Sequence, residues 1–354
     1  MEFWSLLLSI TQSCVQILLV CVTGYVCAYM GMVTPTVQKG LSKLIVAVLL
    51  PCYLFTEVAV GIDIDTLIRL WPIAAFMGLY AVLGSTIGWV GGKILGTSKK
   101  ETNFIITGIV FNNLTSLSVS LLNNIEHTPA VQYLLIDEDD IPADAIRRGI
   151  SFALLASLLG NFLRKSISTI FKNMILKIVT SIREIMNPPL YAAVLAVIVG
   201  TIPTLKNLFF GHNAILYPTI TKTMITLGNL SIPITLLLLG TQLNNSPPTA
   251  KDSQLFPTIG WVMASRFLFV PIFGISLVYL TRTWYSYYDP MLWFVLMLLS
   301  ASPTAVNCIN LTQLTGTFQE EMSTLLFYSY VLTAPILTFL IMIMILVIQN
   351  AKLS

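Results

Sequence analysis

The chain has 354 residues, of which 56% are apolar and only 10% are charged, and its net charge is +3. Soluble domains contain about 25% charged residues, so this composition excludes a soluble protein and predicts one that crosses a membrane repeatedly. The sequence has no clustered Ser, His and Asp, no metal-ligand spacing and no glycine-rich phosphate loop. We therefore expect no enzyme, no cofactor, no metal and no nucleic-acid partner.

A membrane-crossing helix needs about 20 mostly apolar residues, and about ten stretches of this chain meet that requirement. In chain order they are 4–30, 39–61, 70–95, 102–124, 147–164, 187–202, 217–240, 256–281, 290–312 and 320–349. The last stretch is longer than a bilayer requires, so it is expected to tilt or to project. The predicted fold class is an all-α polytopic membrane protein.

Basic residues gather in the odd-numbered connections between these stretches, which predicts that those connections face the cytosol. The fifth connection, residues 165–186, is the most basic, whereas the fourth is acidic between Glu126 and Asp144. Both termini are then expected on the lumenal or extracellular side. Apolar residues near helical spacing predict that 165–186 forms a basic amphipathic helix on the cytosolic membrane surface, the alternative being a plain linker.

Several features recur in the same order in the two halves of the chain. Pro35 and Pro203 follow the first and sixth stretches, while Pro51 and Pro233 lie inside the second and seventh. A period of five spans turns the second copy upside down, which is the inverted-repeat plan of many secondary transporters. The expected organisation is a first five-helix repeat at 1–164, the linker at 165–186 and a second, inverted repeat at 187–354.

Glycines in the third stretch are spaced four residues apart, at Gly84, Gly88 and Gly92. Small residues at that spacing let helices approach closely, so they predict a tight packing stripe, the alternative being direct contact with a substrate.

Two polar clusters interrupt the fourth and ninth stretches. Lipid cannot satisfy freed backbone groups or amide side chains, so paired clusters predict broken helices that line an enclosed substrate site. The candidate substrate-binding residues are Asn112, Asn113, Thr115, Ser116, Ser302, Pro303, Thr304 and Asn307. The alternative is polar contact between helices with no ligand.

Helix breaks at these clusters would favour an anionic ligand. The candidate break or hinge residues are Pro51, Ser118, Pro233 and Pro303, three of which lack a backbone donor. If the fourth and ninth helices both break near mid-membrane, positive half-helix N-termini point into the site and favour an anion such as a carboxylate.

Two charged residues fall inside predicted spans. Glu57 is a candidate coupling carboxylate, or it reaches the membrane interface beside Asp63 and Asp65. Arg266 is a candidate for attracting an anion or bracing a helix break, or its side chain extends to the cytosolic face.

Several short segments together carry a resemblance to a known family. They are 51–55, 187–190, 227–236, 266–268, 302–314, Glu321, Ser323 and 328–330. With these residues the chain resembles the auxin efflux carrier (membrane transport protein) family, most closely its PIN-LIKES and fungal branch.

The resemblance implies ten helices in two inverted five-helix repeats, with broken fourth and ninth helices that cross around the substrate site. It implies elevator-type alternating access and transport of a small organic anion of the indole-3-acetate type. It also points to a homodimer and to the endoplasmic reticulum membrane, with the plasma membrane as the alternative.

The fourth stretch departs from the family. Where the family usually reads Gly-Asn-Leu-Gly-x-x-Pro, residues 112–118 read Asn-Asn-Leu-Thr-Ser-Leu-Ser, which keeps the asparagine as Asn113. Two alternatives stay open: a membrane sensor or regulator that does not transport, and a cation-coupled organic-anion symporter of the bile-acid type.

Overall fold

A computed structural model describes residues 2–61, 71–113, 116–126, 128–137, 139–172, 188–211, 214–245, 256–285, 289–305, 308, 312 and 317–353. Regular structure in these residues is helical, apart from a single β-bridge described below. The first half of the chain forms α1 (Glu2–Tyr29), α2 (Pro35–Leu44), η1 (Ile45–Leu49), α3 (Leu50–Gly61), α5 (Trp71–Ile94), α6 (Lys99–Val110), α7 (Ser116–Ile125), η2 (Pro129–Leu134) and α8 (Pro142–Lys172).

The second half forms α10 (Pro188–Thr201), α11 (Pro203–Phe210), η3 (Tyr217–Thr221), α12 (Lys222–Asn229), α13 (Ser231–Asn245), α14 (Phe256–Ala264), η4 (Ser265–Phe269), α15 (Val270–Thr281), α16 (Pro290–Ala301) and α18 (Gln319–Leu353). Three short elements, η1, η3 and η4, are π-turns inside or at the start of longer helices.

Six helical runs are long and apolar enough to cross a membrane: Ile10–Tyr29, Pro35–Gly61, Trp71–Ile94, Tyr217–Gln242, Phe256–Thr281 and Pro335–Lys352. A seventh follows if α10 and α11, which are bent by 107° at Ile202, count as one broken span. The chain is thus an all-helical polytopic membrane protein, and the prediction of about ten spans stays a prediction. The remaining expected spans fall on α8 and on the short helices α6, α7 and α16.

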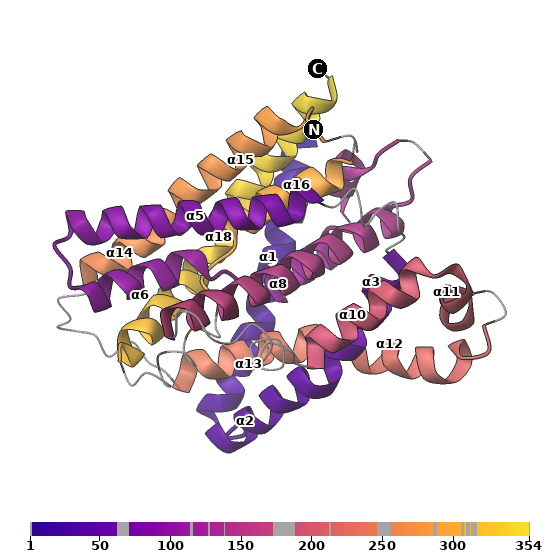
Figure 1. Ribbon diagram of the computed structural model, residues 1–354, viewed down its shortest axis with the longest axis horizontal. Helices are drawn as coiled ribbons and strands as arrows, with labels where there is room; N and C mark the ends of the chain where they lie inside the picture. Colours follow the sequence, from indigo (N-terminus) through magenta and orange to yellow (C-terminus); the bar gives the residue numbers. More distant parts are fainter. Residues whose placement is uncertain are drawn as a thin grey trace.

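Figure 1 shows the arrangement of the helices. On one side lie α3, α10, α12 and α13, and on the other lie α5, α6, α14, α15, α16 and α18, with α1 and α8 between them. α1 packs along α13, and α10 packs along α3. The first of these contacts is very close, since a Cβ on Gly240 would lie 1.8 Å from the Cys21 carbonyl oxygen.

The glycine stripe of α5 packs against α6, which confirms the predicted close approach. A Cβ on Gly88 would lie 3.0 Å from the Ile106 Cα, and one on Gly92 would lie 2.5 Å from the Thr102 hydroxyl. The stripe therefore fixes the position of α6 against α5, and the first polar cluster follows the C-terminal end of α6.

Pro51 and Pro233 each follow a local irregularity. Pro51 lies two residues after the end of the π-turn η1, and Pro233 lies in the first turn of α13, just after α12 ends at Asn229. A proline removes a backbone donor, and a π-turn or a break accommodates that loss. The two irregular regions touch, because a Cβ on Gly228 would lie 2.8 Å from the Tyr53 Cα.

The expected linker begins inside a helix. α8 continues to Lys172, past the expected boundary at 164, so the start of 165–186 is a helical extension of the fifth span. The rest of that predicted amphipathic helix lies outside the described residues.

A group of charged side chains fixes the start of α16. Arg148, on α8, donates two hydrogen bonds to Asp140, at 2.9 and 2.6 Å, and a third from Nε to Asp289, at 3.3 Å. Asp289 caps α16 by accepting the Met291 N–H at 2.9 Å. The bonds from Arg148 lower the pKa of Asp140, whereas burial raises the pKa of Asp289, partly opposed by Arg148.

Candidate substrate site at a helix crossing

The two polar clusters meet where two helices end. α6 ends at Val110 and α7 begins at Ser116, while α16 ends at Ala301 and an extended segment follows it. Asn112 and Thr304 form an antiparallel β-bridge between these segments. The Asn113 N–H donates to the Pro303 carbonyl and the Ala305 N–H donates to the Phe111 carbonyl, both at 2.8 Å. We call this bridge and its flanking residues, 111–113 and 302–305, the crossing.

Each segment of the crossing caps the helix that leads into the other. The last carbonyls of a helix have no partner within it, and lipid cannot supply one. The Asn112 side-chain amide donates to the Leu299 carbonyl of α16 at 2.7 Å, and the Thr304 hydroxyl donates to the Gly108 carbonyl of α6 at 2.9 Å. The two clusters thus stabilise each other's breaks reciprocally.

Arg266 reaches the crossing from the π-turn η4. Its side chain is 2% exposed, and its Nη2 donates to the Pro303 carbonyl at 3.2 Å. The side chain therefore braces the crossing and does not extend to the membrane surface. Its Nε has no hydrogen-bond partner, and no carboxylate pairs with it, among the residues that the structure describes.

Tyr330, on α18, is a part of the site that the sequence marked only through the family resemblance. Its buried hydroxyl accepts a hydrogen bond from the Asn113 amide at 2.7 Å and donates to the Thr304 carbonyl at 3.2 Å. A buried tyrosine hydroxyl requires such partners, but nothing in the local sequence says which residues supply them.

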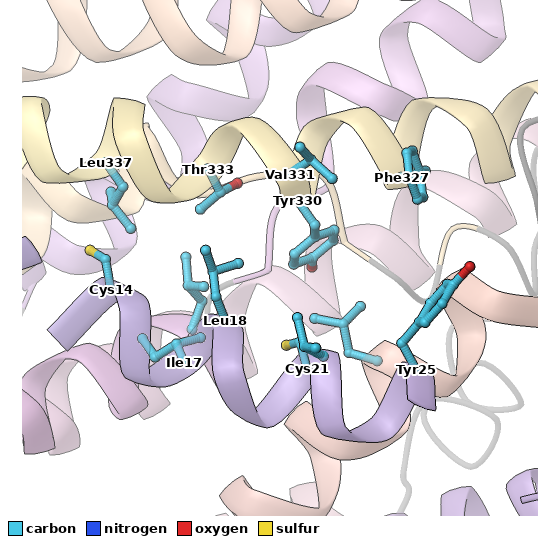
Figure 2. Close-up of a pocket in the computed structure, with 13 residues that line it drawn as sticks. Cys14, Ile17, Leu18, Cys21, Tyr25, Phe327, Tyr330, Val331, Thr333 and Leu337 are labelled. Carbon is cyan, nitrogen blue, oxygen red and sulfur yellow. The ribbon is translucent and has the colours of Figure 1, made fainter. Parts of the chain in front are cut away.

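A cavity of about 160 Å³ lies beside the crossing, between α1 and α18. Its lining is almost wholly apolar and includes Cys14, Ile17 and Cys21 from α1, and Phe327, Tyr330 and Leu337 from α18. Figure 2 shows the Tyr330 ring pointing from α18 toward α1. Leu117, in the first turn of α7, and Leu239, on α13, also line this α1–α18 cavity, which therefore extends to the N-terminal end of α7. The cavity is open where Val22 and Val331 are exposed.

The remaining cluster residues are placed as follows. The Ser302 hydroxyl donates to the Leu298 carbonyl at 3.1 Å. Ser116 begins α7. Ser118, expected at the break, lies inside α7, and its buried hydroxyl has no partner within the described part of the chain. Thr115 and Asn307 lie outside the described residues.

Glu57 lies on α3, which packs against α8. The Ser151 hydroxyl of α8 donates to the Glu57 backbone carbonyl at 3.2 Å. The structure thus brings Asn112, Asn113, Pro303, Thr304 and Arg266 together and places Glu57 at a helix interface.

Non-helical backbone that is paired inside a helical bundle, as at 111–113 and 302–305, is common in secondary transporters. The sequence pattern of the membrane transport protein family matches residues 9–175 and 170–341. The chain therefore belongs to this family, that of the auxin efflux carriers, and is a membrane transporter and not an enzyme.

Relatives in fungi and plants match nearly the whole chain. The uncharacterized transporter YBR287W of Saccharomyces cerevisiae is 26% identical over 92% of this chain and 92% of its own length. Protein PIN-LIKES 2 of Arabidopsis thaliana is 25% identical over 86% of each chain. Protein PIN-LIKES 7 of the same plant is 26% identical over 96% of this chain and 97% of its own length.

Proposed function

We propose that this transporter moves a small amphipathic organic anion, of the indole carboxylate type, and binds its carboxylate at the crossing. The observation that carries the proposal is Arg266, a buried guanidinium on the Pro303 carbonyl whose Nε has no partner among the described residues. An arginine at the centre of a membrane helix costs about 2.5 to 3.5 kcal/mol, so its retention in that position needs a function. An anionic substrate supplies the missing counter-charge.

The N-terminal end of α7 supports the same chemistry. A helix N-terminus carries unpaired N–H groups and a partial positive charge, which attract a carboxylate. Leu117 in that first turn lines the α1–α18 cavity, and the neighbouring Ser118 hydroxyl is buried without a partner within the described residues. A carboxylate would therefore meet donors from α7 and from the Asn113 amide.

The α1–α18 cavity supports an apolar body for the substrate. Ligand sites are mostly apolar, and the lining of this cavity is almost wholly apolar. The Tyr330 ring is part of that lining, while its hydroxyl bonds to the crossing. The cavity volume of about 160 Å³ suits a compact ring system better than a long chain.

Alternating access by an elevator-type movement accounts for the arrangement of the helices. In this proposal α1, α3, α10, α12 and α13 form the static body, and the crossing moves with α5, α6, α8, α14, α15, α16 and α18. The pairing of α1 with α13 and of α10 with α3 supports inverted repeats, since each pair joins one helix from each half. A cytosolic central linker, location in the endoplasmic reticulum membrane and a homodimer belong to the same proposal.

Uptake of labelled indole-3-acetate into proteoliposomes tests this function. We expect uptake by the natural chain, and a loss of at least about tenfold in kcat/KM for Arg266→Gln, because the buried positive charge is removed. Arg266→Lys keeps the charge and should retain part of the activity. Asn113→Ala should raise KM.

The control is Arg282→Gln, since Arg282 stacks on Tyr279 at the end of α15, outside the crossing. Equal uptake by the natural chain and Arg266→Gln would overturn the site assignment. Thermal stabilisation by indole-3-acetate without uptake or counterflow would identify the sensor alternative. Uptake that requires a sodium or proton gradient would identify the cation-coupled alternative.

A further inference from the structure

Tyr330 belongs both to the wall of the α1–α18 cavity and to the crossing. We infer that Tyr330 is a positioning residue for transport: its hydroxyl orients the Asn113 amide toward the substrate, while its ring lines the cavity. The inference rests on the proposed function of the crossing as the substrate site.

The hydrogen bonds of the hydroxyl fix the direction of the Asn113 amide. A tyrosine hydroxyl has one hydrogen, and here it donates that hydrogen to the Thr304 carbonyl at 3.2 Å. Toward Asn113 it must therefore accept, from the amide nitrogen at 2.7 Å. The amide nitrogen carries a second hydrogen, so Asn113 keeps one N–H with which to bind a carboxylate. Without the hydroxyl, neither the orientation of the amide nor its donor is fixed.

Because the Tyr330 hydroxyl is buried, its hydrogen-bond partners are not easily replaced. Tyr330 is 5% exposed and lies in a cavity whose other walls are almost wholly apolar, so water does not replace a lost partner readily. The same hydroxyl holds both segments of the crossing, because Asn113 lies on the first and Thr304 on the second. A substrate whose apolar body occupies the cavity and whose carboxylate reaches the crossing therefore meets an amide with a fixed orientation, which lowers the entropy cost of binding.

Tyr330→Phe tests the inference with labelled indole-3-acetate in proteoliposomes of the full chain. We expect KM to rise about tenfold while kcat stays within about twofold, since the change affects binding and not the movement. Tyr328→Phe is the matched control, because Tyr328 lies on the same helix, is 37% exposed, and does not line the cavity. It should leave both constants unchanged.

A double variant separates positioning from general support of the fold. If Tyr330 acts through the Asn113 amide, Tyr330→Phe should raise KM no further in the Asn113→Ala background. Full additivity of the two changes would overturn the inference, and so would an unchanged KM in Tyr330→Phe alone.

Hydrogen exchange provides a readout that does not depend on transport. The backbone N–H groups of Asn113 and Ala305 form the bridge of the crossing, and they should exchange faster in Tyr330→Phe than in Tyr328→Phe. If the natural chain fails to take up indole-3-acetate, the proposed substrate is wrong. Hydrogen exchange alone then tests whether Tyr330 holds the crossing in place. Exchange equal to that of the natural chain would then refute the positioning role.

Discussion

Replacing Arg148 by methionine tests the charge group that holds the start of α16. The change removes three hydrogen bonds, and it leaves Asp289, which is 0% exposed, as a buried carboxylate without its cation. Removing one partner of a buried ion pair costs about 3 to 5 kcal/mol. Because 20% of the Arg148 side chain is exposed, we expect a loss near the lower end, about 3 kcal/mol in the free energy of unfolding.

The neighbouring residue is a matched control. Arg147 pairs with Asp144 at 3.7 Å, and these side chains are 48% and 57% exposed. Exposed pairs contribute about 0 to 1 kcal/mol, so Arg147→Met should cost less than about 1 kcal/mol. Unfolding of the purified variants in detergent, followed by tryptophan fluorescence, measures both losses.

The loss for Arg148→Met should depend on pH, and the sign follows from Asp289. Burial raises the pKa of Asp289, and without Arg148 that pKa rises further. A group with a raised pKa contributes stability that is fully present below its unfolded pKa, about 3.9, and is lost as the pH rises through the folded pKa. Arg148→Met should therefore lose more stability at about pH 8 than at about pH 5.

Asp140 does not mask this dependence. Its pKa is lowered by Arg148, so its contribution to stability is lost only as the pH falls below the unfolded value. Adding Asp289→Asn to Arg148→Met removes the buried charge and should recover about 1 to 2 kcal/mol. Equal losses at both pH values, with no recovery in the double variant, would refute this account of the charge group.

Two further substitutions test the packing and the crossing. Gly240→Ala places a Cβ 1.8 Å from the Cys21 carbonyl oxygen, so α1 and α13 must separate. The yield of folded protein in size-exclusion chromatography should therefore collapse. Gly260→Ala is the control, because a Cβ there has no atom within 4 Å, and it should behave as the natural chain. Thr304→Val leaves the Gly108 carbonyl of α6 uncapped and should lower the free energy of unfolding by about 1 to 3 kcal/mol. Thr226→Val is the control, because that exposed hydroxyl bonds only within its own helix, and it should lower the free energy of unfolding by less than about 0.5 kcal/mol.

Hydropathy predicts the membrane class because composition alone determines which solvent the chain requires. It does not predict where helices end. Pro303 signals a break through its missing donor, but the break between Val110 and Ser116 contains no proline and is marked only by its polar residues. The sequence predicts only the end of a span at Ile202, before Pro203, where the structure has a bend of 107°.

The candidate site is predicted in part. Asn112, Asn113 and Thr304 are polar residues in apolar surroundings, which is a local signal that a single sequence contains. Tyr330 bonds to a residue 217 positions away, so only the folded topology reveals its role. From the sequence, Arg266 could either brace a helix break or attract an anion, or extend to the cytosolic face. The choice requires the position of the Pro303 carbonyl, which lies 37 residues further along the chain.

The reciprocal caps give a physical reason for the unusual fourth-span sequence. In the resembling family a glycine usually occupies the position of Asn112, and a glycine has no side chain with which to cap another helix. Here the Asn112 amide binds the Leu299 carbonyl, as the Thr304 hydroxyl binds the Gly108 carbonyl in the other direction. Asparagine in place of glycine therefore gives both halves of the crossing a side-chain cap. It leaves Asn113, which the family also has, to bond to Tyr330 and, in the proposed function, to the substrate.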